Sequence, residues 1–221
     1  MESDKTLTEI AYKHIFDAIL SGKYRSGQSL SPDNIVAQLN ISKTPVREAL
    51  VELEAEGIIS RNGRYYNVIF LDQKDILDLY ELRAILESEA AALACERVDQ
   101  NQIDELKEAL RLIREAVSEK DPEPIKLADL NGKYHALIAK ASGNRYLAEY
   151  TSSIRLKLKI IRTTLFTSYD RRMEEVEEHE AILSAIERGD SELARSGVII
   201  FERKSPVVVL YHLWHVILDE Q

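Results

Sequence analysis

Hydrophobic positions in the first third of the chain recur at helical spacing and are interrupted by turn signals. A first helix is predicted to stop near Gly22. A second opens at Ser31-Pro32, with Ser31 as a plausible N-cap, and a third follows the turn at 40–42. Either Ser42 or Thr44 could cap the third helix. The predicted buried faces of the three helices consist of Leu7, Ile10, Ala11, Ile15, Ala18 and Ile19, then Ile35, Val36 and Leu39, then Val46, Leu50, Val51 and Leu53.

A β-hairpin is predicted directly after the third helix. Residues 58–61 and 65–70 are rich in β-branched and aromatic types, and they flank the pair Asn62-Gly63. Such a pair between two strand-like runs favours a tight hairpin, because both turn positions tolerate positive φ. Arg61 and Arg64 lie beside its tip. Three short helices followed by a basic hairpin predict a winged helix-turn-helix, a fold that meets DNA.

Only helical patterns follow the hairpin. After a polar linker at 72–75, amphipathic helices are predicted over 76–98, 102–120, 124–142, 145–166, 171–188 and from 191 onward. The breaks at 142–144 and 189–190 have the composition of helix C-caps. The sequence therefore predicts a mostly α protein with a winged helix-turn-helix domain at 1–71 and an all-helical bundle at 76–221.

Composition adds a constraint on where DNA could bind. The 221 residues are 45% hydrophobic and 30% charged, with a net charge of -9. Residues 1–71 carry 8 Lys and Arg against 9 Asp and Glu, so a net charge of -8 belongs to the rest of the chain. DNA binding by the first domain therefore requires its cations to gather on one face.

Other global features indicate an intracellular protein. Cys95 is the only cysteine, which rules out an internal disulfide, and its apolar surroundings indicate a small core residue. The N-terminal residues lack signal-peptide character. The apolar run 207–218 is too short to span a bilayer. We therefore expect a cytoplasmic location and no membrane partner.

Several motifs in a fixed order resemble one known family. The N-terminal motifs resemble the winged helix of GntR-superfamily transcription regulators, and the later ones resemble the FCD ligand-binding domain of the FadR-like branch. The matching segments are Gly27-x-x-Leu30, 41–50 and 53–59 in the first part, and 79–87, 131–144 and 178–190 in the second.

The resemblance implies that the third helix enters the major groove of double-stranded DNA and that the wing touches the backbone or minor groove. Arg47 can contact guanine with two hydrogen bonds, and a helix N-terminus favours phosphate. Lys43 stands where relatives commonly carry Arg, which favours a phosphate contact. Asp33 stands where some relatives have Arg. The alternative for Arg47 is an ion pair with Glu48 or Glu52. The candidate DNA-binding residues are Ser42, Lys43, Thr44, Arg47, Gly63 and Arg64.

The resemblance also implies a divalent-metal site inside the bundle, for Zn, Ni or Mn. Asn131, His135 and His179 fill three of its four positions, and Phe201 stands at the fourth, where it cannot ligate a metal. His212 and His215 lie too far along one straight helix to substitute directly. The alternatives are a weakly held ion, histidines that bind an organic effector, and satisfied core histidines.

An effector pocket is expected in the same domain. By resemblance Arg83 faces this cavity, where a buried guanidinium suits a carboxylate ligand. Its alternative is an internal salt bridge to Glu87, four residues further along the helix. The candidate effector residues are Arg83, Tyr134, His135, Asn144 and His179, although Tyr134 could be a core aromatic and Asn144 a helix cap.

Together these features predict a DNA-binding transcription regulator, acting as a repressor on a palindromic operator. We expect a homodimer controlled by a small carboxylate effector. A constitutive DNA-binding protein with a degenerate sensor domain remains as an alternative. A metal-dependent enzyme is disfavoured, because no HExxH, GxSxG or suitable carboxylate pair is present.

Overall fold

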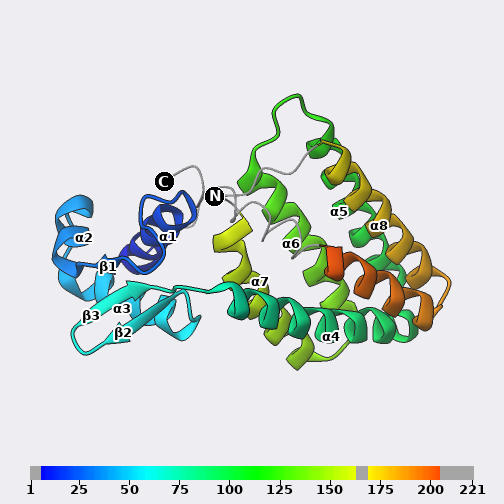
Figure 1. The fold of residues 1–221 in the computed structure, drawn as a ribbon, viewed down its shortest axis with the longest axis horizontal. Helices are drawn as coiled ribbons and strands as arrows, with labels where there is room; N and C mark the ends of the chain where they lie inside the picture. Colours follow the sequence, from blue (N-terminus) through cyan, green and yellow to red (C-terminus); the bar gives the residue numbers. More distant parts are fainter. Residues whose placement is uncertain (1–5, 163–168, 205–221) are drawn as a thin grey trace. The chain divides into compact units, whose positions relative to one another are not determined.

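The computed structural model describes residues 6–162 and 169–204 (Figure 1). The chain divides into two compact units, Met1–Asp72 and Gln73–Gln221. The first unit contains a small antiparallel sheet with three helices, and the described part of the second is entirely helical.

Three helices form the core of the first unit: α1 (Leu7–Leu20), α2 (Pro32–Leu39) and α3 (Lys43–Ala55). Thr6 caps α1 in a reciprocal capping box with Glu9, and the hydroxyl of Ser31 accepts a hydrogen bond at the start of α2. Asn40 ends α2 in the left-handed conformation, with φ of 51°. Local capping interactions and the left-handed residue Asn40 thus set the ends of these helices. Its fully buried apolar residues include Ala11, Ile15, Ile35, Val46, Ala49, Leu50 and Leu53.

The sheet has three strands rather than the two of the predicted hairpin. The strands β1 (Ser29–Leu30), β2 (Ile59–Asn62) and β3 (Tyr65–Val68) lie antiparallel in the order β1-β3-β2. The hairpin loop also differs from the predicted one. Asn62 pairs with Tyr65, so the loop residues are Gly63 and Arg64, and of these only Gly63 has a positive φ, 63°. Glycine at the first loop position is the pattern of a type II′ turn.

The second unit contains α4 (Gln73–Arg97), α5 (Gln100–Ser118), α6 (Pro124–Ala141), α7 (Arg145–Arg162), α8 (Tyr169–Glu187) and a helix over 191–204. The start of α4 at Gln73 makes residues 73–75, expected in a linker, helical. The start of α5 lies two residues before the predicted one, because Asp99 forms a capping box with Gln102. The predicted end of α7 beyond residue 162, the run 207–218, His212 and His215 all lie outside the described residues.

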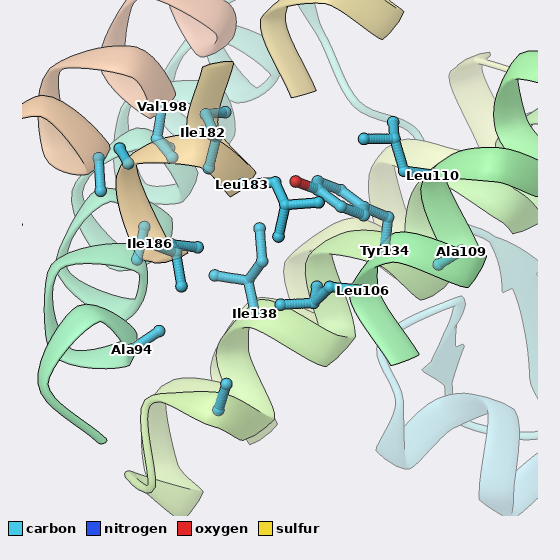
Figure 2. Packing of buried hydrophobic residues seen from close by; sticks show 14 of the residues in the cluster. Ala94, Leu106, Ala109, Leu110, Tyr134, Ile138, Ile182, Leu183, Ile186 and Val198 are labelled. Carbon is cyan, nitrogen blue, oxygen red and sulfur yellow. The ribbon is translucent and has the colours of Figure 1, made fainter. Parts of the chain in front are cut away.

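A single apolar cluster holds the second unit together, and Figure 2 shows part of it. Helices α4, α5, α6 and α8 and the helix over 191–204 each supply residues to it, so α6 is packed among α5, α8 and the helix over 191–204. Buried members include Leu106, Leu110, Tyr134, Ile138, Ile182, Leu183, Ile186 and Val198. This packing fixes the positions of the polar side chains that α6 and α8 carry on the same buried faces.

The structure confirms the predicted fold class of a mostly α protein with a small β wing. Among the described helices, none combines the length and the apolar character needed to cross a bilayer.

Candidate functional site

The N-terminal end of α3 exposes a polar face. Ser42, Lys43, Thr44 and Arg47 are exposed, whereas the neighbouring Pro45, Val46, Ala49 and Leu50 are buried. Ser42 is the N-cap residue, but its side chain makes no capping hydrogen bond within the described residues. The free N–H groups of this helix end and its two cations point to an anionic partner.

One of these cations is held by an acidic neighbour. The ammonium of Lys43 lies 2.6 Å from Oδ1 of Asp33, which belongs to the first turn of α2. The hydrogen bond and charge of Lys43 lower the pKa of the Asp33 carboxyl below its usual value. Both side chains are more than half exposed, so the pair is screened by solvent and contributes little to stability.

Arg47 keeps its guanidinium available. No ion pair with Glu48 or Glu52 occurs among the described residues, although such a pair was the alternative from sequence. The carboxylate of Glu48 instead accepts a hydrogen bond from the hydroxyl of Thr8 at 2.7 Å. Arg47 is therefore the cation of this face best placed to bind another molecule.

The wing presents two arginines with different surroundings. Nε of Arg61 donates to the carbonyl of Gly63 at 2.9 Å, and its guanidinium lies 5.6 Å from the ring centre of Tyr66. Arg61 thus stiffens the hairpin tip. Arg64 is exposed in the loop itself, next to Gly63.

The second unit buries a cluster of two guanidiniums and two carboxylates. Arg83 of α4 donates from Nε to Glu87 at 3.0 Å and from Nη2 to Glu202 at 2.6 Å. Nη2 of Arg155, on α7, donates to Oε2 of Glu87 and lies 3.7 Å from Oε1 of Glu202. Arg83, Glu87 and Glu202 are at most 3% exposed. The predicted salt bridge from Arg83 to Glu87 is therefore present, within a larger cluster.

Electrostatics keep these groups charged. Burial would raise the pKa of Glu87, but the charges of Arg155 and Arg83 outweigh burial and hold this pKa well below its usual range. For Arg83, burial is opposed by Glu202 and Glu87, which raise its pKa. Burial, followed by the charge of Arg83, lowers the pKa of Arg155 to about 10. Arg155 is therefore the less well compensated of the two cations.

His135 joins this cluster to a second histidine. Its Nδ1 lies 2.9 Å from Oε2 of Glu87, and its Nε2 lies 2.9 Å from Nε2 of His179. An ionised carboxylate can only accept, so Nδ1 of His135 carries the hydrogen. Burial, aided by the charge of Arg155, lowers the pKa of His135 from 6.5 to about 3. His135 is thus neutral, and its bare Nε2 accepts a hydrogen bond from Nε2 of His179.

The ring of Phe201 packs against both histidines. Its centre lies 5.2 Å from that of His135 and 4.8 Å from that of His179, and Phe201 is 1% exposed. The apolar ring therefore stands at the position where the family resemblance expects a metal ligand.

The remaining candidates have contrasting surroundings. Tyr134 is fully buried, and its hydroxyl donates to the carbonyl of His179 at 2.8 Å, which ties α6 to α8. Oδ1 of Asn144 accepts from the backbone N–H groups of Tyr146 and Leu147, as a cap of α7 does. The structure brings Arg83, Tyr134, His135 and His179 together, whereas the contacts of Asn144 are those of a helix cap.

Two donor sets test whether a divalent metal fits. One carboxylate oxygen each from Glu87 and Glu202 and one ring nitrogen of His135 lie within 4.8 Å of one another. Both carboxylates already bind guanidiniums, and His135 directs an N–H group at Glu87. Two cationic side chains therefore occupy the surroundings in which a metal cation would have to be bound.

The second set is Asn131, His135 and His179. In its favour, Oδ1 of Asn131 is buried with no hydrogen-bond partner among the described residues, while its Nδ2 donates to Leu127. All three donors are neutral, however, and Phe201 supplies no fourth. Structural zinc sites use four protein ligands. The charges of Arg155 and Arg83, which depress the pKa of His135, also repel a dication there. This set does not fit a tightly held resident ion.

Sequence reasoning missed Arg155 and Glu202. A signal for both was present, because each is a charged residue in an apolar helical register. Arg155 follows Thr151 by four residues beside Ile154 and Leu158, and Glu202 follows Val198 by four. Of these six residues, only Arg155 is more than a tenth exposed on its side chain.

The geometry defines a class of protein. A winged helix-turn-helix with an exposed cationic helix end, followed by a helical unit with a buried polar cluster, is the architecture of a DNA-binding regulator with a sensor domain.

Comparison with known proteins identifies the family. Residues 7–65 match the bacterial regulatory proteins of the gntR family, and residues 78–199 match the FCD domain. An uncharacterized HTH-type transcriptional regulator of Mycobacterium tuberculosis is 30% identical over 190 residues, which cover 84% of this chain and 74% of the relative. The chain therefore belongs to the GntR family of transcriptional regulators that carry an FCD domain, and it is not an enzyme.

Two further similarities agree. The gluconate operon transcriptional repressor of Bacillus licheniformis is 26% identical over 184 residues, which cover 79% of this chain and 73% of that protein. The solved structure of McbR/YncC from E. coli has a TM-score of 0.80 at 22% identity, covering 95% of this chain and 99% of that chain. At this identity the structural likeness supports the fold alone.

Proposed function

We propose that this regulator is a repressor that binds a palindromic operator as a homodimer and responds to a small carboxylate metabolite in its helical unit. The observation that carries the DNA-binding part is the exposed end of α3, where Thr44 and Arg47 lie beside a helix N-terminus. Arg47 would read a base in the major groove, and Lys43 and Arg64 would contact phosphates. The gluconate repressor among the relatives supports the direction of control.

The test of the DNA-binding part is the affinity of the full chain for operator DNA selected from a random library. Arg47→Ala should weaken specific binding at least about tenfold, since one good base contact is worth roughly 1–3 kcal/mol of discrimination. Lys13→Ala is a matched control, because it removes one exposed cation from α1, where Lys13 pairs with Asp17. Equal affinities of Arg47→Ala and the wild type would refute the proposed contact.

A dimer is supported by the surface of the helical unit. Leu77 and Ile85 of α4 are 42% and 59% exposed, and both line a groove of about 730 Å³ between α4 and the helix over 191–204. Large exposed apolar side chains around one groove commonly mark an interaction surface. A two-fold dimer would also place two α3 helices on the two halves of a palindrome.

The control mechanism would act through α4. This helix carries Arg83 and Glu87 and follows β3 of the wing after only the four residues 69–72. A ligand that changes the contacts of the buried cluster would bias the position of α4 and, through the chain connection, that of the DNA-binding head. The coupling is measured as the change in operator affinity when a metabolite is added.

The buried cluster also favours a second candidate function. Among the described residues its two guanidiniums and two carboxylates balance in charge, and Phe201 fills the place of a ligand. Such a charge-balanced cluster, with Phe201 in the place of a ligand, is what we would expect in a constitutive DNA-binding protein. A metabolite screen that never changes operator affinity would favour this candidate over the ligand-controlled repressor.

For the metal, we infer that Asn131, His135 and His179 bind a Zn, Ni or Mn ion only weakly. When no ion is bound, the two histidines form a hydrogen bond with each other instead. Metal analysis after purification in metal-supplemented medium tests this inference. A stoichiometric ion that survives dialysis, with a melting temperature that falls on chelation, would contradict it.

A further inference from the structure

A cavity of about 230 Å³ lies between α6 and α7, next to the buried cluster. Its α6 wall is formed by small residues at one-turn intervals, Ala128, Gly132 and Ala136. A Cβ atom built on Gly132 would meet no atom within 4 Å, so the space above this glycine is open. The volume of the cavity lies below the roughly 300–1,000 Å³ of pockets for drug-sized ligands, which indicates a small metabolite as the ligand.

The α7 wall carries two polar groups that lack partners. Thr151 is 1% exposed, and its hydroxyl has no hydrogen-bond partner among the described residues. Within the same part of the chain, Nε of Arg155 is buried and likewise unpartnered. Both residues line the cavity. Buried donors without partners destabilise a fold, so two of them at one cavity indicate a missing acceptor.

The two buried arginines, Arg83 and Arg155, differ in how their guanidinium nitrogens are used. Arg83, which also lines the cavity, donates from two different nitrogens to the two carboxylates. Arg155 meets both carboxylates with the single nitrogen Nη2, which leaves its Nε–H for another molecule. The lowered pKa of Arg155, about 10, agrees with a cation whose charge is not fully compensated.

We propose that this cavity is the effector site of the regulator, and that it binds the carboxylate of a small metabolite through Nε of Arg155 and the hydroxyl of Thr151. The inference rests on the proposed function and assigns its ligand class and residues. The recognition group is thus Arg155 rather than Arg83 or a metal ion. Lys159, paired with Asp129 and 19% exposed on its side chain, also lines the cavity.

The donor count favours a carboxylate over a phosphate. One N–H and one O–H match the two oxygens of a single carboxylate, which carries one negative charge. A phosphate group carries about -1.5 to -2 charges and three acceptor oxygens, some of which would stay unpaired and buried here. The carboxylate would also restore charge compensation to Arg155.

The experiment measures ligand binding to the full chain without DNA, by calorimetry and thermal shift. One arm is a series of straight-chain monocarboxylates of two to six carbons and their 2-hydroxy derivatives. The other arm is inorganic phosphate and sulfate. We expect carboxylates to bind and to raise the melting temperature, with little effect from the inorganic anions. Absence of carboxylate binding, or preferential binding of phosphate or sulfate, overturns the proposal.

Two variants, Thr151→Val and Gly132→Leu, locate the site, and each has a control. Thr151→Val removes the unpaired hydroxyl at constant shape, so the unliganded protein should melt at the same temperature or higher. Carboxylate affinity should nevertheless fall about tenfold or more, as expected for a lost hydrogen bond to a charged group. Thr8→Val, in the other unit, is the matched control and should leave the carboxylate affinity unchanged.

Gly132→Leu would fill the open space above α6 and abolish carboxylate binding. Its companion Gly132→Ala adds one methyl group to open space and favours the helix, so its melting temperature should equal or exceed that of the wild type. Carboxylate binding that persists in a folded Gly132→Leu variant would overturn the site.

Failure of this inference and failure of the proposed function can be told apart. Binding that requires Thr151 and Gly132 but leaves operator affinity unchanged would refute metabolite control and keep the site. Operator affinity that responds to a carboxylate equally in the wild type and in Gly132→Leu would keep metabolite control and refute the site.

Discussion

Phe201 shows how one side chain changes what a buried polar site can bind. Its ring contacts His135 and His179, two imidazoles held 2.9 Å apart through their Nε2 atoms. The hydrogen bond from His135 to Glu87 sets the tautomer that a metal ligand would need, because it leaves Nε2 bare. Glu87 therefore orients His135 as it would orient a metal ligand, whereas Phe201 leaves the site one ligand short.

Phe201→His should create the missing ligand. We expect the variant to take up about one Zn or Ni ion per chain, because four protein ligands are then available. The ion should raise the melting temperature, and chelation should reverse the rise. Phe201→Leu is the control that keeps an apolar side chain and should gain no metal. A Phe201→His protein with no more metal than the control would show that the arginines exclude the ion.

His135 makes stability depend on pH. In the folded chain its pKa is lowered from 6.5 to about 3, so between these values only the unfolded state binds a proton. The free energy of unfolding should therefore fall as pH drops below 6.5, by about 2 kcal/mol near pH 5. The depressed pKa of Glu87 acts in the same direction at lower pH, as the unfolded carboxylate protonates first.

Denaturant titrations from pH 7 to 5 measure this effect. His135→Gln should flatten the dependence, whereas His14→Gln, on α1 in the other unit, should keep it. An unchanged slope in His135→Gln would show that the protein loses stability through other groups.

At the scale of elements, an ion pair between α2 and α3 occupies the Lys43 cation when no DNA is bound. Asp33 at the start of α2 pairs with Lys43 at the start of α3. A phosphate must displace this carboxylate before Lys43 can contribute to binding. The carboxylate also repels the DNA backbone, so Asp33 lowers the affinity of the head.

Asp33→Asn should therefore tighten the binding of the full chain to duplex DNA. We expect the slope of log affinity against log salt to steepen by up to about one unit, because phosphate then no longer shares the charge of Lys43 with Asp33. The measurement is a salt titration with a short duplex of random sequence. Asp17→Asn removes an equivalent exposed charge, paired with Lys13 on α1, and is the matched control. Equal slopes for the two variants would show that Lys43 does not meet phosphate.

Elements with local signals were predictable from the sequence, and long-range contacts were not. Ser31, Pro32 and the helical spacing of Val46 and Leu50 sufficed for the helix-turn-helix. The pairing of β1 with β3 was missed because β1 has only two residues, and that pairing is what makes them a strand. The pairing of Arg83 with Glu202 is likewise a long-range contact. The two residues are 119 positions apart, so local spacing in the sequence could not reveal it.

At the scale of the whole molecule, the two units divide the work of binding and control. Residues 1–71 are nearly neutral in charge, with 8 cationic and 9 acidic side chains, so one head alone should bind DNA modestly. Pairing of two heads by the helical units would multiply this affinity without any new contact.

The full chain should accordingly behave as a dimer of about 50 kDa in solution, twice the chain mass of 25.2 kDa. Analytical ultracentrifugation of free protein and of its operator complex measures the mass and the number of chains bound. We expect two chains per operator, with affinity per chain falling on dilution below the dimer dissociation constant. One chain per operator at micromolar concentration would refute the dimer.

The buried cluster also constrains how this protein can change over evolutionary time. Replacing Arg83, Glu87, Arg155 or Glu202 alone would strand a charge in the interior, at a cost of about 3–5 kcal/mol. Such a loss is a large part of the stability of a domain, so single replacements should be removed by selection. Exchanges should instead occur in pairs of opposite sign. Among close relatives we expect these four positions to covary, although they are spread over three helices and 119 residues of chain.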